Sequence, residues 1–165
     1  MGAQLRIYRR RIKSTKSTAK ITRAMELIAA TRITKAQRAA EAAGPYAREI
    51  TRAVSALASR VGDHPLLSEA ENPKRAAVLV VSSDKGLAGA FSANIMKEAE
   101  SLTQLLQEQG KEVLTYMVGR KGVAFYKFRE RELEGQWEGI TESPTYAHAQ
   151  EIGSTLMEKF SQDTE

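Results

Sequence analysis

Residues 3–61 contain one glycine and one proline, Gly44 and Pro45, and many alanines. Glycine and proline are the residues that most disfavour an α-helix, so a stretch of this length with one adjacent pair predicts a long helix. Proline inside a helix costs about 3 kcal/mol and bends the axis. We therefore expect one N-terminal helix over residues 1–61, kinked at 44–45. Two helices that meet at Pro45 are the alternative.

Small and apolar residues recur along the second part of this stretch at alternating steps of four and three. This spacing is a heptad seam, which is typical of a helix that pairs with another helix. Alanine fills the first half of the seam and larger apolar residues fill the second, so a partner helix could approach closely. The positions are Ala36, Ala40, Ala43, Ala47, Ile50, Val54, Leu57 and Val61.

The net charge of +5 is distributed unevenly. Residues 1–60 carry 14 Lys and Arg against 3 Asp and Glu, a net charge of +11, whereas residues 61–165 carry 11 against 17, a net charge of −6. A basic arm on an acidic body indicates that the arm faces a negatively charged partner. The chain has no cysteine, which excludes disulfides, thiolate metal sites and a cysteine nucleophile within it.

The remaining residues predict an α/β fold. Residues 62–75 are rich in Gly, Pro and charge and are expected to form a linker. From residue 76 to 165 strands and helices alternate with short connections, which predicts a small, Rossmann-like parallel α/β domain. The apolar run at 78–81 indicates a strand buried on both faces, and a weak third strand is expected near Trp137. The last helix should begin with Ser143 as its N-cap and Pro144 in its first turn.

The helix after the first strand should place its apolar residues on one face. Its C-terminal end should lie at Gly110, as is common for glycine. The expected apolar face is Phe91, Ile95, Ala99, Leu102 and Leu106.

The segment SSDKGLAGAF, residues 82–91, is the best candidate for a small-molecule site, because glycine-containing loops between a strand and a helix often bind phosphates. It lacks both the Walker pattern and G-x-G-x-x-G. We therefore expect Gly86 and Gly89 to serve a tight turn and close helix–strand packing. Asp84 could hold a metal or a ribose, but a turn or cap role is the better interpretation. A small nucleotide-binding enzyme stays a third hypothesis.

Residues 6–23 carry eight basic residues and no acidic one. Such a helix could bind nucleic acid by neutralising phosphates, so a basic helical nucleic-acid-binding protein is the main alternative function. The charges are expected to surround the helix without forming one basic face, which favours a protein partner with acidic loops.

Two stretches identify a family. ITRAMELIAATRITKAQ, residues 21–37, closely resembles the N-terminal helix signature of the γ subunit of F-type ATP synthase, and SSDKGLAGAFSANI resembles that family's second signature. GRKGVAFYKF and SPTYAHAQEI follow in the family's order, so the resemblance covers essentially the whole chain. The last of these motifs is similar to that of bacterial members, and actinobacteria are the expected group. The family's chains are nearly twice as long, so the sequence is expected to be an N-terminal fragment.

The resemblance implies a rotor shaft that turns in the α₃β₃ ring and couples proton-driven c-ring rotation to the catalytic β subunits, without a catalytic site or cofactor of its own. It also implies a peripheral position at the cytoplasmic face of the bacterial plasma membrane and no nucleic-acid partner. The residues expected to contact the α₃β₃ ring are Leu5, Arg9, Ile12, Ile21, Arg23, Met25, Glu26 and Ile28. Those expected to pair with the absent C-terminal helix of the same γ chain are Ala36, Ala40, Ala43, Ala47, Ile50, Val54 and Leu57. Those expected in a foot facing the ε subunit and the c-ring are Asp84, Lys85, Gly86 and Gly89.

Overall fold

The computed structural model describes residues 2–58, 60–61 and 73–162, and the chain divides into two compact units, residues 1–64 and 65–165. Most of the linker expected at 62–75 lies outside the described residues. Its last residue, Arg75, already belongs to the first strand.

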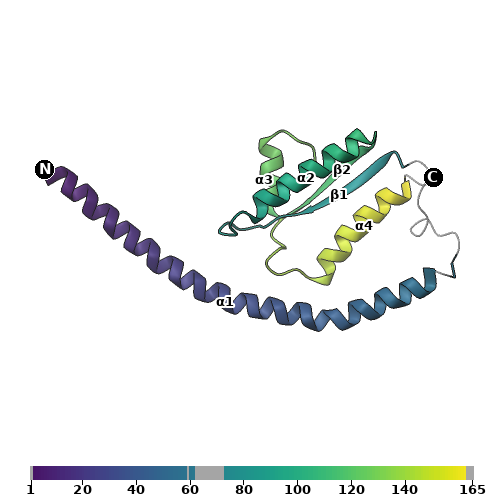
Figure 1. The fold of residues 1–165 in the computed structure, drawn as a ribbon, viewed down its shortest axis with the longest axis horizontal. Coiled ribbons are helices and arrows are strands. Elements are labelled where there is room, and N and C mark those ends of the chain that lie inside the picture. The colour runs from purple at the N-terminus through teal and green to yellow at the C-terminus, as the bar shows by residue number, and fades with distance from the viewer. Residues whose placement is uncertain (1, 59, 62–72, 163–165) are drawn as a thin grey trace. The chain divides into compact units, whose positions relative to one another are not determined.

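The first unit is a single helix, α1, from Gly2 to Ala58 (Figure 1). It contains 57 residues, and none of them is buried. The helix runs through Pro45 without a break, so the chain does not form two helices that meet there. Several threonine hydroxyls donate to carbonyls one turn earlier, such as Thr18 to Ser14 at 3.1 Å and Thr22 to Thr18 at 3.0 Å. These hydroxyls are therefore satisfied within the helix.

The second unit holds three parallel strands in the order β1-β2-β3. The strands are β1 (Arg75–Val81), β2 (Glu112–Val118) and β3 (Gly135–Trp137). The helices are α2 (Phe91–Glu108), α3 (Arg120–Phe128) and α4 (Tyr146–Gln162). The expected fold class, a long N-terminal helix followed by a small parallel α/β layer, is confirmed.

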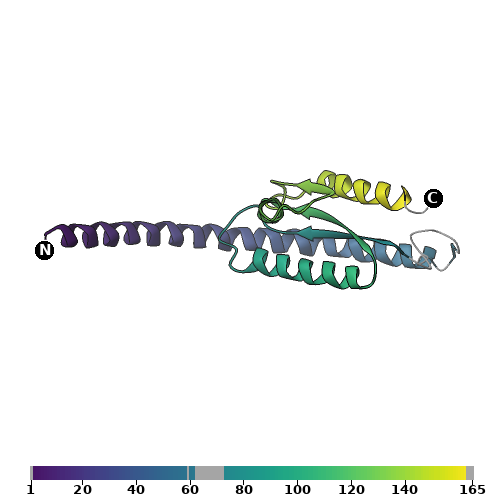
Figure 2. The same cartoon turned by 90° about the horizontal axis from the view of Figure 1, so that it is seen from above.

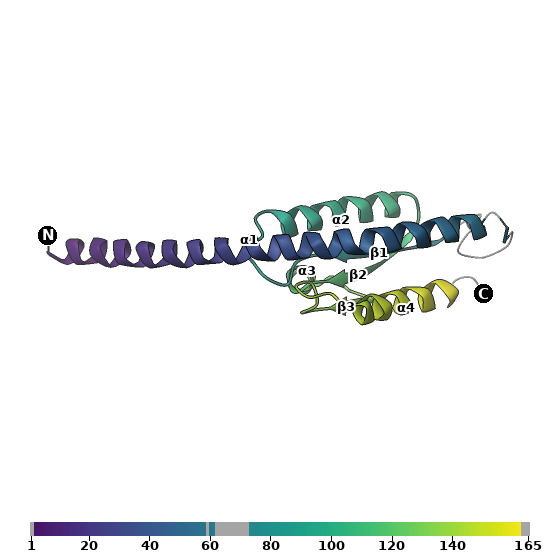
Figure 3. The ribbon, with the colours of Figure 1, turned by 90° about the horizontal axis from the view of Figure 1, so that it is seen from below.

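Helices cover the sheet on both sides (Figures 1, 2 and 3). α2 and α3 lie on one side, where the main apolar core is formed by Val78, Val80, Met96, Ala99, Met117, Val123 and Tyr126. α4 lies on the other side, toward β3. The Trp137 indole N–H donates to Glu151 at 3.1 Å, and Lys159 pairs with Glu134 at 3.8 Å. These two contacts connect α4 with β3 and the residue before it.

One expectation about packing was wrong, and another was met in part. β1 is not buried on both faces: Val78 and Val80 are buried, but Leu79 and Val81 are 40% and 50% exposed. The reason is that β1 is an edge strand of the described sheet and only its α2 side is covered. The expected apolar face of α2 is confirmed for Ile95, Ala99 and Leu106, which lie in or against the core, whereas the two other residues assigned to that face are half-exposed. These are Phe91 and Leu102.

The ends of two helices show how local sequence sets their limits. Gly110, at a φ of +77°, follows the end of α2, and the N–H of Lys111 donates back to the carbonyl of Leu106 at 3.0 Å, as expected for a glycine C-terminus. α4 begins at Tyr146 and not after Ser143. Its cap is Thr145, whose hydroxyl accepts from the N–H of His148 at 3.4 Å, while the His148 ring accepts from the N–H of Thr145 at 3.3 Å.

Candidate functional site

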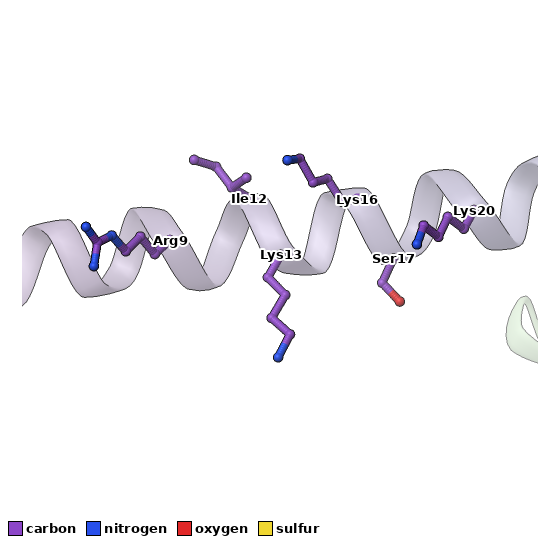
Figure 4. A pocket seen from close by; sticks show the side chains of 6 residues that line it. All are labelled: Arg9, Ile12, Lys13, Lys16, Ser17 and Lys20. Atoms are coloured by element: carbon purple, nitrogen blue, oxygen red, sulfur yellow. The ribbon is translucent and has the colours of Figure 1, made fainter.

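The N-terminal third of α1 carries a line of cations along one side. At 3.6 residues per turn, six of its eight basic residues fall within a sector of about 100°. We call these six the basic stripe: Arg6, Arg9, Lys13, Lys16, Lys20 and Arg23. Figure 4 shows the middle of the stripe, where Arg9, Lys13, Lys16 and Lys20 border one surface together with Ile12 and Ser17. The expectation that the charges surround the helix was therefore wrong; only Arg10 and Arg11 lie off this side.

The chain offers the basic stripe almost no carboxylate that could neutralise its charge. The first acidic residue of the chain is Glu26, whose carboxylate pairs with Arg23 at 2.7 Å. Both side chains are well exposed, so this pair is easily exchanged for another partner. From Arg6 to Lys20 the helix therefore presents an uncompensated positive surface.

The residues assigned to the α₃β₃ ring lie on two different sides of α1. Leu5 and Ile12 border the basic stripe, which includes Arg9 and Arg23. By helical geometry, the other apolar members lie about 120° away around the axis. These members are Ile21, Met25 and Ile28, and each is about half-exposed. The helix thus has a cationic side and a thin apolar side.

The heptad seam forms a third surface of α1. By helical geometry its members from Ala36 to Leu57 fall within a sector of about 100°. The large ones, Ile50, Val54 and Leu57, are about half-exposed. No part of α1 itself covers this apolar line.

Asp84, at the carboxyl end of β1, is a hydrogen-bond centre of the α/β unit. One of its carboxylate oxygens accepts from the N–H groups of Arg120 at 3.0 Å and Gly139 at 2.7 Å. The other accepts from the N–H and the hydroxyl of Thr141 at 2.8 and 2.6 Å. Burial alone would raise the pKa of Asp84, but these hydrogen bonds outweigh it and hold the pKa well below its usual value.

The carboxylate of Asp84 therefore has a structural role. Its two oxygens already accept four hydrogen bonds, so no oxygen is left to ligate a metal or a ribose. Among the residues that the structure describes, no three His, Asp or Glu side chains gather into a possible metal site. Asp84 was interpreted either as a ligand for a metal or a ribose or as a turn or cap residue, and its hydrogen bonds match the cap.

Two glycines that the sequence did not single out hold this corner together. A side chain at Gly119 would collide with Ser82, and one at Gly122 would collide with Met117 and Ser82. The buried hydroxyl of Ser82 uses this closeness: it lies 3.0 Å from the carbonyl of Val118 and accepts from the N–H of Gly122 at 2.9 Å. The sequence signal that could have revealed these two glycines is their spacing in GRKG, residues 119–122, directly after a strand.

The loop after β1 matches its expected role only in part. Gly89 has a φ of +57°, which favours glycine and supports the tight turn. Gly86 has a negative φ, and an added side chain would meet only the end of Lys121 at 3.9 Å. The close helix–strand packing expected of Gly86 and Gly89 is therefore wrong, because Gly119 and Gly122 supply it.

The same corner forms an open depression lined by Asp84, Lys85, Gly86, Leu87, Arg120, Lys121 and Ala124. Lys85 pairs with Glu142, and Arg120 pairs with Glu138 at 3.4 Å. Of the four residues assigned to a foot, Asp84, Lys85 and Gly86 line this depression, whereas Gly89 does not.

Comparison with known proteins gives a consistent result. A family model described as ATP synthase matches residues 4–165. The chain is 80% identical over 164 residues to the ATP synthase gamma chain of Thermobifida fusca, and 58% identical over 161 residues to that of Acidothermus cellulolyticus. It is 53% identical over 165 residues to the ATP synthase gamma chain of Streptomyces coelicolor.

These alignments cover 99%, 97% and 99% of this chain but 54% of each relative. The chain thus spans about half the length of the curated relatives it matches. The alternative of a nucleic-acid-binding protein finds no support in them. In the described residues, no helix has the length and apolarity that a membrane crossing requires.

Proposed function

Because the chain belongs to the ATP synthase gamma-chain family, we propose that it is part of the central-stalk rotor of a bacterial F₁F₀ ATP synthase. In this role it couples rotation of the c-ring to conformational change in the catalytic β subunits. The observation that carries the proposal is α1, a helix of 57 residues in which no residue is buried. A helix of this kind must find its partners outside its own fold.

The length of α1 suits the transmission of torque. At about 1.5 Å per residue the helix spans roughly 85 Å, far more than a unit of this size needs for its own packing. Its backbone hydrogen bonds run along the axis, and the threonine hydroxyls are bonded to the same backbone. The helix can therefore act as a shaft that a partner turns at one end.

The thin apolar side of α1 suits a bearing. Ile21, Met25 and Ile28 bury little surface in the chain itself, so they are free to touch the inner wall of an α₃β₃ ring. A narrow apolar line gives only a small free energy of contact with each subunit. The shaft can therefore pass three successive β faces without being held tightly by one.

The basic stripe suits an acidic partner. Arg9 and Arg23 lie in a surface of six cations with a single nearby carboxylate, Glu26. Opposed charges guide and orient an encounter more than they add to its affinity. We assign the stripe to the acidic lever loop of the β subunits, which the shaft meets in turn.

Two further surfaces complete the proposal. The seam from Ala36 to Leu57 pairs with a C-terminal helix of the same γ chain, which would cover the exposed Ile50, Val54 and Leu57. The corner around Asp84 and Lys85 belongs to a foot on the side of the ε subunit and the c-ring. The chain itself is non-catalytic, and the complex lies at the cytoplasmic face of the membrane.

Assembly tests the proposal. The full-length gamma chain that contains these residues should co-purify with the α, β and ε subunits. Reversing the stripe with Lys13→Glu and Lys20→Glu should reduce ATP-driven proton pumping by the complex several-fold, because two attractive charges become repulsive. The matched control is Lys97→Glu with Lys127→Glu, the same charge change at exposed positions of α2 and α3. Failure of the unmodified chain to co-purify would refute the proposed function.

A further inference from the structure

Pro45 is the residue of α1 that fits helix chemistry least. The helix continues through it, although proline has no N–H to donate and its ring clashes with the carbonyl four residues earlier, that of Glu41. The residue before a proline normally avoids the helical conformation, because its Cβ meets the proline ring. Here that residue is Gly44, which has no Cβ. The pair Gly44 and Pro45 is therefore suited to bend a helix without ending it.

The helix α1 is bowed. Figure 1 shows that it changes direction within its second half, and Figures 2 and 3, turned by 90°, show it almost straight, so the bow lies in one plane. Long helices often curve because one side packs on a core, but no residue of α1 is buried. A proline is a common cause of a change in helix direction, and Pro45 is the single proline of α1.

The direction of the bend follows from the missing hydrogen bond. Because the proline ring pushes the carbonyl of Glu41 away, the helix is longest on the proline side, and that side is convex. Ala43 and Ala47 lie two residues before and after Pro45, which places each of them about 160° around the axis from it. Both alanines belong to the heptad seam. The seam is therefore on the concave side of the bend, and its members nearest to the bend are small.

We propose that Pro45 is a positioning residue. It bends α1 around the helix that pairs with the seam, and it thereby moves the N-terminal part of the shaft off the line of the rest. Met25 lies about 30 Å beyond Pro45, so a bend of about 20° displaces it sideways by about 10 Å. A straight rod on the axis of a ring meets all subunits alike, whereas a displaced rod meets one at a time. The inference rests on the proposed function, which supplies the ring and the paired helix.

Straightening the shaft should strengthen the helix and weaken coupling. In the full-length gamma chain, Pro45→Ala restores the missing N–H, so the melting temperature should stay the same or rise. Residual dipolar couplings of the present chain should show that the angle between the two halves of α1 falls by about 20°. ATP-driven proton pumping by the reassembled complex should nevertheless fall several-fold. Pro144→Ala, the same change just before α4, is the matched control and should alter neither the angle nor the pumping.

Moving the glycine–proline pair tests the direction of the bend. In two further variants alanine replaces the pair at 44–45, and the pair is rebuilt either four or two residues earlier. Four residues earlier, the proline stays within about 40° of its present side, so pumping should largely recover. Two residues earlier, it lies on the seam side, so pumping should stay low. The first variant carries Ala40→Gly and Glu41→Pro, and the second carries Ala42→Gly and Ala43→Pro, each with Gly44→Ala and Pro45→Ala.

Each outcome decides a different claim. An unchanged angle in Pro45→Ala would show that the proline does not cause the bow. Normal pumping by a straightened variant, an equal loss in Pro144→Ala, or equal pumping by the two rebuilt pairs would show that the bend does not position the shaft. Any of these results overturns the inference while the proposed function stands. If the unmodified gamma chain does not co-purify with the α, β and ε subunits, the proposed function fails and the positioning role with it.

Discussion

The two units of this chain use apolar residues in opposite ways. In α1 no residue is buried along 57 positions, although isoleucine, leucine, valine and methionine recur throughout it. In the α/β unit some of the equivalent residues form a buried core, with Met117 fully buried and Val123 almost so. The comparison teaches that the α/β unit has an apolar core of its own, whereas the apolar residues of α1 find no burial within their helix. Substitutions in the two units should therefore differ in kind: one set changes folding and the other changes coupling.

The largest expected effect is at Gly122. Gly122→Val places a branched side chain where Met117 and the Ser82 hydroxyl already lie. Overpacking of this kind should lower the free energy of unfolding by about 3 kcal/mol, because the neighbours belong to the core. Urea unfolding followed by fluorescence measures it directly, since the single tryptophan, Trp137, lies in the α/β unit.

Gly153 provides the control for this prediction. It also lies in a helix, α4, but an added Cβ there would meet nothing within 4 Å. Gly153→Ala should therefore leave stability unchanged or raise it by up to about 1 kcal/mol, from helix propensity alone. Equal losses in the two variants would show that packing around Gly122 is not what holds the unit together.

The next largest effect is at Asp84. Asn in its place cannot accept all four hydrogen bonds, so Asp84→Asn should lower the free energy of unfolding by about 2 kcal/mol at neutral pH. Because the folded pKa of Asp84 is lowered, its contribution to stability is complete above the pKa of the unfolded chain. That contribution is lost as the pH falls below about 4. The difference between the two proteins in urea unfolding should therefore shrink in acid, and a constant difference would contradict the hydrogen-bond account.

The sequence predicted the helices and strands of both units better than it predicted how they pack and which residues they contact. The scarcity of helix breakers was enough for α1, and the weak strand expected near Trp137 is β3. The apolar run at 78–81 could not reveal that β1 lies at an edge, because that depends on which strands pair. The partners of Asp84 could not be foreseen either. Gly139 and Thr141 lie more than fifty residues further along the chain and reach Asp84 only through the parallel crossover.

The basic stripe shows a different limit of prediction from the sequence. Its six cations are visible in the sequence, but Arg10 and Arg11 stand among them and disguise the helical spacing. Only placing each residue at its angle around the helix separates the stripe from these two. The positions at which α1 meets its partners stay predictions, because they depend on proteins outside this chain.

The smallest expected effect on stability, and the sharpest test of the comparison, is at Met25. Its side chain is 47% exposed on α1, so Met25→Lys should change the free energy of unfolding by less than about 0.5 kcal/mol. If the thin apolar side of α1 is a bearing, the new charge must be desolvated at each passage of a partner surface. ATP-driven proton pumping by the reassembled complex should then fall several-fold. Met157→Lys, the same change at a methionine of α4 that is 42% exposed, is the matched control and should pump normally. Normal pumping by Met25→Lys would mean that this side of the helix touches no partner. The contrast between an α/β unit with its own core and a helix that depends on partners would then rest only on the basic stripe and the heptad seam.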